Sequence, residues 1–279
     1  MMELIDVEDV FTGEFENKQI KLRGWVHRKM SVGGKIFIWL RDPSGVVQCV
    51  VDKSLVNSNV WMRAEKITRE SSIEVLGKVK KDPRAPGGWE VVVNELEIYN
   101  ISEPFVLRGI EDVDFLLDNR HLWIRSRKLT AIMKVKHTVL EAAREWLIEN
   151  GWWEVTPPIL TASACEGGAT LFEVKYFEKK AYLSQSAQLY LEALIFPLGK
   201  VWSLTPSFRA EKSRTRRHLA EYWHLELEAA WCDMEDMMKV AEELISYIIA
   251  RVLEDRLKEL EFLKRDISKL KTALHTPYP

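Results

Sequence analysis

The spacing of apolar residues changes period once along the chain, and this change limits the folds that are available. From Leu129 onward, apolar side chains follow the i, i+3, i+4, i+7 spacing of an amphipathic helix. Before that point, apolar and polar residues alternate, as in half-buried strands. The alternating segments are 20–27, 36–41, 46–51, 72–80 and 89–99. The sequence therefore predicts an all-β domain followed by an α+β domain.

The order of the predicted elements in the first domain is that of an OB barrel. Five strands are expected, with a short helix at residues 60–70 between the third and the fourth. Other small β barrels share this order, so the order alone leaves them open. OB folds stack the bases of single-stranded nucleic acid on aromatic side chains. Candidates for such a face are Arg28, Phe37, Trp39 and Gln48. Composition alone slightly favours a purely structural role for the two aromatic residues, which would close the barrel.

The second half of the chain reads as a mixture of helices and strands. A helix is predicted from Leu129 to Asn150-Gly151, a pair typical of a helix C-terminus. A second long helix is predicted over 234–263, with Asp233 as its N-cap. Strands are expected between these helices, at 171–176, 201–208 and 221–230.

Charge and cysteine spacing exclude several classes of protein. Forty Lys and Arg residues against 42 Asp and Glu residues give a net charge of −2, which excludes nucleic-acid binding by bulk positive charge and leaves a local basic surface open. Three widely spaced cysteines support neither a disulfide framework nor a zinc finger. No apolar run approaches the roughly 18 residues of a membrane span. We expect a cytoplasmic protein without membrane contact.

An arginine-rich segment carries the clearest chemical signal. Residues 209–217 hold four arginines and one lysine between two predicted strands. Guanidinium groups bind phosphate oxygens in bidentate fashion, so the segment favours a nucleotide or another polyanion. On the outgoing strand, Tyr222, His224 and Glu226 share one face. A solvated surface of salt bridges explains the residues about equally well. Neither GxxxxGK[ST] nor GxGxxG occurs, so P-loop and Rossmann nucleotide binding find no support.

Four segments together resemble the class II aminoacyl-tRNA synthetases, in the subclass for aspartate, asparagine and lysine. Phe208-Arg209-Ala210-Glu211, with Arg217-His218 and Glu221-Tyr222, resembles motif 2 of that family. The other three are GWWEVTPP at 151–158, which resembles motif 1, CEGGA at 165–169, which resembles the mobile loop over the amino acid, and QSAQLY at 185–190, which resembles the QS-x-Q segment of the pocket. Such a combination of motifs is highly specific.

The resemblance extends from about residue 14 to residue 264 and implies a domain plan. An OB-fold domain that binds the tRNA anticodon is expected at 1–103, and a connecting hinge at 104–125. The N-terminal part of a class II catalytic domain, an antiparallel sheet with helices, is expected at 126–279.

The resemblance also implies a nucleotide site. Arg209 is expected to contact the α-phosphate of ATP and to stabilise charge during in-line displacement. Glu211 is expected to position the adenine end or the tRNA terminus. Tyr222 would stack on adenine, and Arg217 and His218 would lie near the outer phosphates. Adenylate formation depends mostly on positioning and charge neutralisation, which such residues supply.

Three further residues receive roles from the same resemblance. Glu166 and Gln188 are expected to hold the amino group of the substrate. Pro157, in motif 1, is expected at the interface of a homodimer. ATP and Mg²⁺ are the implied cofactors, with the Mg²⁺ ligands expected in a C-terminal part that this chain lacks.

In the barrel, the resemblance assigns residues to the anticodon. Phe37 and Gln48 match positions that stack on and hydrogen-bond the central anticodon base, uridine. Many relatives carry an arginine on the first strand where this sequence has Met30. Arg28 lies nearby and is the expected substitute. The resemblance reverses the slight preference for a structural Phe37.

The choice between asparagine and aspartate depends on one charge. Aspartate-specific pockets resemble QSPQ-x-x-Lys, whereas Leu191 stands at the Lys position here, which would leave a substrate carboxylate without its counterion. Glu226 can accept a hydrogen bond from a carboxamide but would repel a carboxylate. Residues 189–193 and 214–222 also resemble asparaginyl-tRNA synthetases. Asparagine and tRNA(Asn) are therefore the expected partners, with aspartate and tRNA(Asp) as the alternative.

A Gly-rich motif 3, with an arginine for the γ-phosphate, is absent from the sequence. We therefore expect an asparagine–tRNA ligase whose chain is incomplete alone, either as a fragment or as half of a split enzyme. The alternatives are an aspartate–tRNA ligase, including a non-discriminating one, and a tRNA-binding fragment without catalysis. An amino-acid-handling relative that does not charge tRNA fits poorly, because it would have no use for Phe37 and Gln48.

Overall fold

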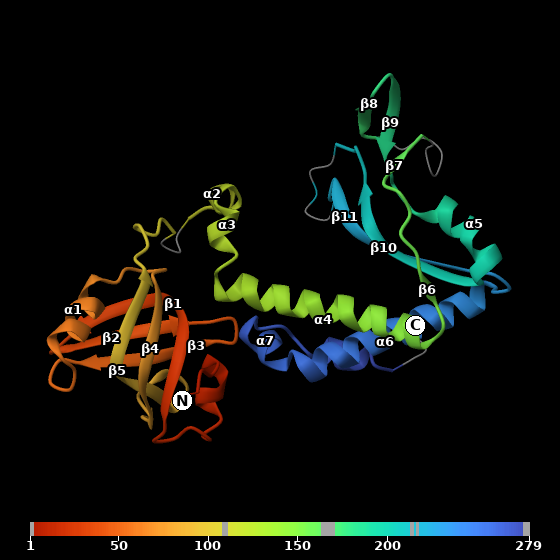
Figure 1. The fold of residues 1–279 in the computed structure, drawn as a ribbon. Coiled ribbons are helices and arrows are strands. Elements are labelled where there is room, and N and C mark those ends of the chain that lie inside the picture. The colour runs from red at the N-terminus through yellow and green to blue at the C-terminus, as the bar shows by residue number, and fades with distance from the viewer. Residues whose placement is uncertain (1–2, 108–110, 163–170, 213–214, 216–217, 276–279) are drawn as a thin grey trace. The chain divides into compact units, whose positions relative to one another are not determined.

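The computed structural model describes residues 3–107, 111–162, 171–212, 215 and 218–275. It separates into two compact units, Met1–Asp118 and Asn119–Pro279. The division falls within residues 104–125, where the hinge is expected. The two units are described in turn (Figure 1).

The first unit is a closed five-stranded barrel in the order β1-β2-β3-β5-β4, which confirms the OB prediction. Only β3 and β5 pair in parallel, and the other four pairings are antiparallel. A short helix, α2 (Val113–Asp118), follows the barrel. The barrel elements are η1 (Val7–Phe11), β1 (Gln19–Val32), β2 (Lys35–Arg41), β3 (Val46–Asp52), α1 (Ser58–Lys66), β4 (Ser72–Lys81), η2 (Pro86–Gly88) and β5 (Trp89–Asn100).

A β-bulge in β1 changes which side chains face the barrel interior. Up to Val26, which pairs with Leu40, even-numbered residues of β1 point inward. His27 is the extra residue, so that Arg28 pairs with Trp39 and Lys29 with the buried Ile38. Arg28 consequently lies on the outer face of the barrel.

The helix predicted at 60–70 is shorter at its C-terminus than expected. Helix α1 ends at Lys66, and Ile67 is already extended. The Lys29 ammonium donates hydrogen bonds to the carbonyl oxygens of Glu65 and Ile67, both at 2.7 Å, and to that of Ala64 at 3.4 Å. Burial lowers the pKa of Lys29. Lys29 thus satisfies carbonyl groups that the end of the helix leaves free.

The second unit contains two three-stranded sheets with helices around them. One sheet has the order β11-β10-β6, in which β6 is parallel to β10, and the other has the order β7-β9-β8. The strands are β6 (Trp153–Glu154), β7 (Leu160–Thr161), β8 (Glu173–Tyr176), β9 (Lys179–Leu183), β10 (Lys200–Phe208) and β11 (Glu221–Ala229). The helices are α3 (Arg120–Trp123), α4 (Arg127–Glu149), α5 (Gln188–Leu198), α6 (Met234–Asp255), α7 (Leu257–Phe262) and α8 (Ser268–Thr272).

The hairpin of β10 and β11 has an apolar face and a polar face. Trp202, Leu225 and Leu227 lie on the apolar face and pack against α4 and α6, which run side by side (Figure 1). On the opposite face, Val201 packs with Leu191 of α5. Helix α5 therefore covers one end of the polar face and leaves the rest of it beside the segment that precedes the helix.

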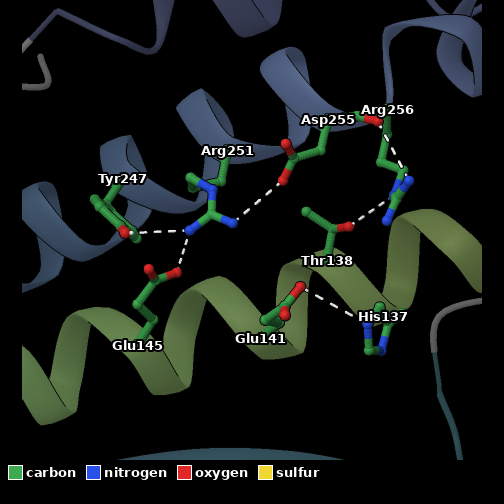
Figure 2. Close-up of polar contacts among 8 residues, drawn as sticks. All are labelled: His137, Thr138, Glu141, Glu145, Tyr247, Arg251, Asp255 and Arg256. Atoms are coloured by element: carbon green, nitrogen blue, oxygen red, sulfur yellow. Dashed lines mark hydrogen bonds and ion pairs between the residues drawn. The ribbon is translucent and has the colours of Figure 1, made fainter.

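The long helix predicted over 234–263 is divided at Arg256. This residue leaves the helical conformation, with φ −126° and ψ 23°, and its Nε donates to Thr138 Oγ1 of α4 at 2.8 Å. Close by, Arg251 pairs with Glu145 of α4 and with Asp255 of its own helix (Figure 2). Asp233 caps α6 as predicted. Across the described ranges, no helix is both long and apolar enough to cross a membrane.

Candidate functional site

The polar face of the β10–β11 hairpin is the first candidate site. Strand register places Ser203 opposite Glu226, Thr205 opposite His224 and Ser207 opposite Tyr222. This arrangement follows from the alternation of the sequence, because the residues between these positions lie on the apolar face. The expected grouping of Tyr222, His224 and Glu226 on one face is confirmed.

Glu226 is held in place from three directions. Ser186 Oγ donates a short hydrogen bond to one carboxylate oxygen, and the Ala187 backbone N–H donates to the other at 2.9 Å. His224 Nδ1 lies 3.3 Å from that second oxygen. Only 12% of the Glu226 side chain is exposed. A carboxylate fixed in this way keeps its position while it accepts further hydrogen bonds.

Aromatic and cationic groups continue the same face toward the arginine-rich segment. His224 Nδ1 contacts Ser207 Oγ at 3.1 Å, and its ring centre lies 5.3 Å from that of Tyr222. The guanidinium carbon of Arg209 lies 5.7 Å from the centre of the Tyr222 ring. The face thus leads from an exposed guanidinium, across an aromatic ring, to a fixed carboxylate.

The segment between β9 and α5 closes one side of this face. Gln188 Nε2 donates to Glu192 Oε1 at 2.9 Å. Burial, followed by the nearby Glu192 carboxylate, raises the pKa of Glu228.

Two buried groups, Gln185 Nε2 and Ser203 Oγ, have no hydrogen-bond partner within the part of the chain that the structure describes. Such groups mark places where a water molecule or a ligand completes the hydrogen bonding.

The remaining predicted residues of this region are placed as follows. Glu211 is exposed, and the exposed His218 contacts Thr215 Oγ1 through Nδ1 at 2.6 Å. Pro157 is half-buried and follows β6. Glu166 and Arg217 lie outside the described residues.

The outer face of the barrel is the second candidate site. Phe37 and Trp39 point outward from β2, with ring centres 6.5 Å apart. The Arg28 guanidinium lies over the Trp39 ring at 5.1 Å. Gln48 is buried, and its Nε2 donates to Glu90 Oε2 at 3.1 Å. The structure therefore brings the predicted Arg28, Phe37 and Gln48 onto one surface.

Among the described residues, no three His, Cys, Asp or Glu side chains gather in a way that could hold a metal ion. Ser186 and Ala187 both hold Glu226, although the sequence predicts no separate role for either residue. The QS-x-Q segment was the signal available for them. That segment does not indicate that their partner is Glu226, which lies 40 positions after Ser186.

Comparison with known proteins follows the same division of the chain. Residues 20–99 match the family of OB-fold nucleic acid binding domains, and residues 112–276 match the family of class II tRNA synthetases (D, K and N). The chain is 59% identical over 269 residues to the asparagine–tRNA ligase of Pyrococcus furiosus, covering 95% of this chain and 62% of that protein. It is 58% identical over 280 residues to the Thermococcus kodakarensis enzyme of the same name, covering 100% of this chain and 64% of that one.

A solved structure resembles the chain throughout its length. The asparaginyl-tRNA synthetase from Pyrococcus horikoshii, complexed with asparaginyl-adenylate, superposes with a TM-score of 0.93 at 56% sequence identity. The match covers 100% of this chain and 64% of that one. The chain thus spans less than two thirds of the length of the relatives that it matches.

Proposed function

The chain belongs to the class II aminoacyl-tRNA synthetases of the aspartate, lysine and asparagine group, and we propose that it forms part of an asparagine–tRNA ligase. In that reaction the carboxylate of asparagine attacks the α-phosphate of ATP and releases pyrophosphate, and the asparaginyl group then passes to tRNA(Asn). The names of relatives at 58–59% identity support this choice of amino acid.

Glu226 is the observation that carries the proposal. Its carboxylate is held by Ser186, Ala187 and His224 and is mostly buried. A fixed negative charge attracts the NH2 group of a carboxamide and repels a carboxylate. Leu191 supports the same choice, because it is buried among apolar residues of α5 and offers no cation to an aspartate side chain.

Arg209 and Tyr222 suit the nucleotide. Arg209 is exposed and can neutralise charge that develops on the α-phosphate, while Tyr222 offers an aromatic ring beside it for adenine. We assign Glu211, Arg217 and His218 to the same ATP site. The described residues provide no cluster for Mg²⁺, so no step is assigned to the metal through them.

Gln188 and Glu166 are assigned to the amino group of asparagine in the same proposal. Gln188 begins α5 beside Ser186, at the edge of the polar face. On the barrel, Arg28, Phe37 and Gln48 are assigned to the tRNA anticodon. We also propose that the complete enzyme is a homodimer, with Pro157 at its interface, and that it acts in the cytoplasm.

Two alternatives give different expectations. An aspartate–tRNA ligase would require a cation near Glu226. A tRNA-binding fragment without catalysis is favoured by one observation, the closure of the barrel, which makes the RNA-binding face independent of the second unit.

Amino-acid-dependent exchange of pyrophosphate into ATP tests the proposal. The chain is assayed alone and after fusion to the C-terminal third of the Pyrococcus furiosus relative. We expect no exchange from the chain alone and asparagine-dependent exchange from the fusion. Robust exchange by the chain alone would refute the proposal that the chain is incomplete. A fusion that prefers aspartate would refute the proposal that asparagine is the substrate.

The variant Glu226→Gln tests the assigned residue in the active fusion. Loss of the charge should weaken the preference for asparagine over aspartate. Glu178→Gln, in the exposed turn between β8 and β9, is the matched control and should leave the preference unchanged. An unchanged preference in Glu226→Gln would remove Glu226 from the assignment.

A further inference from the structure

The barrel face carries a second aromatic side chain to which the proposed function assigns no role. Trp39 lies two residues after Phe37 on β2, and both side chains point outward. The intervening Ile38 and the flanking Ile36 and Leu40 are completely buried. The two rings are tilted by 35° and are far enough apart, at 6.5 Å between centres, to serve as separate surfaces.

Strand register extends each ring into a row across the barrel. The first row contains Arg28, Trp39 and Gln48, and the second contains Met30, Phe37 and Val50. Rows on one face of a sheet are two residues apart along the strand, about 6.6 Å. OB folds stack successive bases on aromatic residues that are arranged in this way.

The bulge at His27 is the reason that Arg28 meets Trp39. In a regular ladder the inward-facing parity of Val26 would continue to residue 28. The extra residue turns Arg28 outward and places its guanidinium 5.1 Å from the centre of the Trp39 ring. Bulges that redirect a side chain are common beside binding sites.

Arg28 differs from the other cations on this side of the barrel. Lys29 is bonded to carbonyl groups at the end of α1, and Arg69 donates to the Leu107 carbonyl oxygen at 2.7 Å and lies over Phe105. Arg28 is exposed, and its guanidinium lies against the Trp39 ring. A planar guanidinium on an aromatic ring is itself a surface on which a base can stack.

An open hollow of about 540 Å³ adjoins Arg28. Three cationic side chains lie along its wall. Its lining residues are His27, Arg28, Lys29, Ile67, Thr68 and Arg69.

We infer that Arg28 and Trp39 form a second base-stacking platform beside Phe37, so that this face holds two consecutive bases of single-stranded RNA. This inference rests on the proposed binding of a tRNA anticodon and adds a second base position to it. One base stacks on Phe37, and the neighbouring base stacks on the Arg28–Trp39 pair.

A double-mutant cycle between protein and RNA tests the inference. The full chain is titrated with an RNA stem–loop that carries the anticodon loop of tRNA(Asn), intact or with one abasic nucleotide at each anticodon position. Binding is measured by fluorescence anisotropy. Trp39→Leu should weaken binding of the intact RNA at least about fivefold. The effect of Phe37→Leu should disappear when one particular base is removed, which identifies the nucleotide that stacks on Phe37. The effect of Trp39→Leu should disappear when the base of a neighbouring nucleotide is removed instead.

Trp61→Leu is the matched control. Trp61 lies on α1 with its own cationic partner, Lys53, at 5.4 Å, in another part of the barrel. It should leave RNA affinity unchanged. Arg28→Lys retains the positive charge but loses the planar group, so it should reproduce much of the Trp39→Leu loss. Thermal melting of each variant shows whether a loss of RNA affinity is caused by unfolding of the protein.

The outcomes separate the inference from the proposal on which it rests. If the wild-type chain binds the stem–loop and Phe37→Leu weakens binding but a folded Trp39→Leu does not, the second platform is wrong and the anticodon assignment stands. If both substitutions couple to the same nucleotide, the two rings form one site and the inference is also wrong. If the wild-type chain does not bind the stem–loop, both the proposal and the inference fail.

Discussion

The two units differ in how their polar surfaces are supported. In the first unit, 21 buried hydrophobic residues form one cluster inside a closed barrel, and the RNA-binding candidates lie outside it. Among the described residues of the second unit, six buried ones form the larger cluster and three form the smaller one, while several adjoining residues are only half-buried. The barrel face therefore rests on a rigid interior, whereas Glu226 depends on a hydrogen-bonded segment 40 residues away.

A core truncation in each unit would test this comparison most strongly. Ile38→Ala removes a fully buried side chain and should lower the free energy of unfolding of the barrel by about 2–5 kcal/mol. Leu225→Ala, at a half-buried position on β11, should cost less. Hydrogen exchange, followed by mass spectrometry of peptides from each unit, measures the stability of the two units separately. Equal losses would show that the second unit is as tightly packed as the first.

The close approach of β1 to β2 at Gly24 gives the next largest expected effect. A Cβ atom at Gly24 would lie 2.3 Å from the Arg41 carbonyl oxygen, so Gly24→Ala must displace the β1–β2 pairing. We expect a loss of about 1–3 kcal/mol in urea unfolding. Gly45→Ala, where the nearest contact is a Val7 side-chain methyl group at 3.3 Å rather than a backbone oxygen, is the control and should cost less. Similar losses would mean that the barrel absorbs the backbone contact.

Glu74 provides a prediction of pH dependence for the barrel. Burial acts to raise the pKa of Glu74, but hydrogen bonds from Arg23, Lys21 and Tyr99 outweigh it and bring the pKa to about 2. A lowered carboxyl pKa stabilises the folded state above the ordinary value of 4.5, and this contribution is lost as pH falls toward 2.

Glu74→Gln should therefore lower stability by about 1 kcal/mol near neutral pH, and the difference from wild type should shrink below pH 4. Urea unfolding at pH 7, 4 and 2.5 measures it. A stability difference that stays constant from pH 7 to pH 2.5 would show that the ionised Glu74 carboxylate is not the source of the stabilisation.

The ion pairs between α4 and α6 should give the smallest effect. Arg251 pairs with Glu145 and Asp255, but 25% of its side chain is exposed, so water and salt screen the interaction (Figure 2). A double-mutant cycle of Arg251→Met and Glu145→Gln should give a coupling that is small compared with the losses above and that decreases in high salt. A coupling that is insensitive to salt would indicate a dry contact between the helices.

Local patterns predicted the elements whose two faces differ. In most strands of the barrel and in the β10–β11 hairpin, residues alternate between an inner and an outer face, and each predicted segment overlaps a strand, although β1 continues to Val32, beyond its predicted end. Helix α5 was not predicted, because residues 188–198 are apolar on almost every side and give no helical contrast. The division at Arg256 was also missed, because it depends on a bond to Thr138 from a distant helix.

The candidate sites show the same limit. Motif resemblance located Arg209, Tyr222 and Glu226, but their mutual geometry comes from the register of β10 and β11. The partners of Glu226 lie in a loop 40 residues earlier, which no local pattern indicates. Likewise, the contact between Arg28 and Trp39 depends on the register shift between Val26 and Arg28 in β1.

That single residue, His27, gives the barrel a way to change its outer surface without changing its interior. Residues before it follow one inward-outward phase and residues after it follow the opposite phase. Positions 28 and 30 are thereby released from the requirement to be apolar, which inward-facing positions of a small barrel must meet. The bulge thus makes surface positions of two residues that a regular ladder would place in the core, and side chains there can change at little cost to folding.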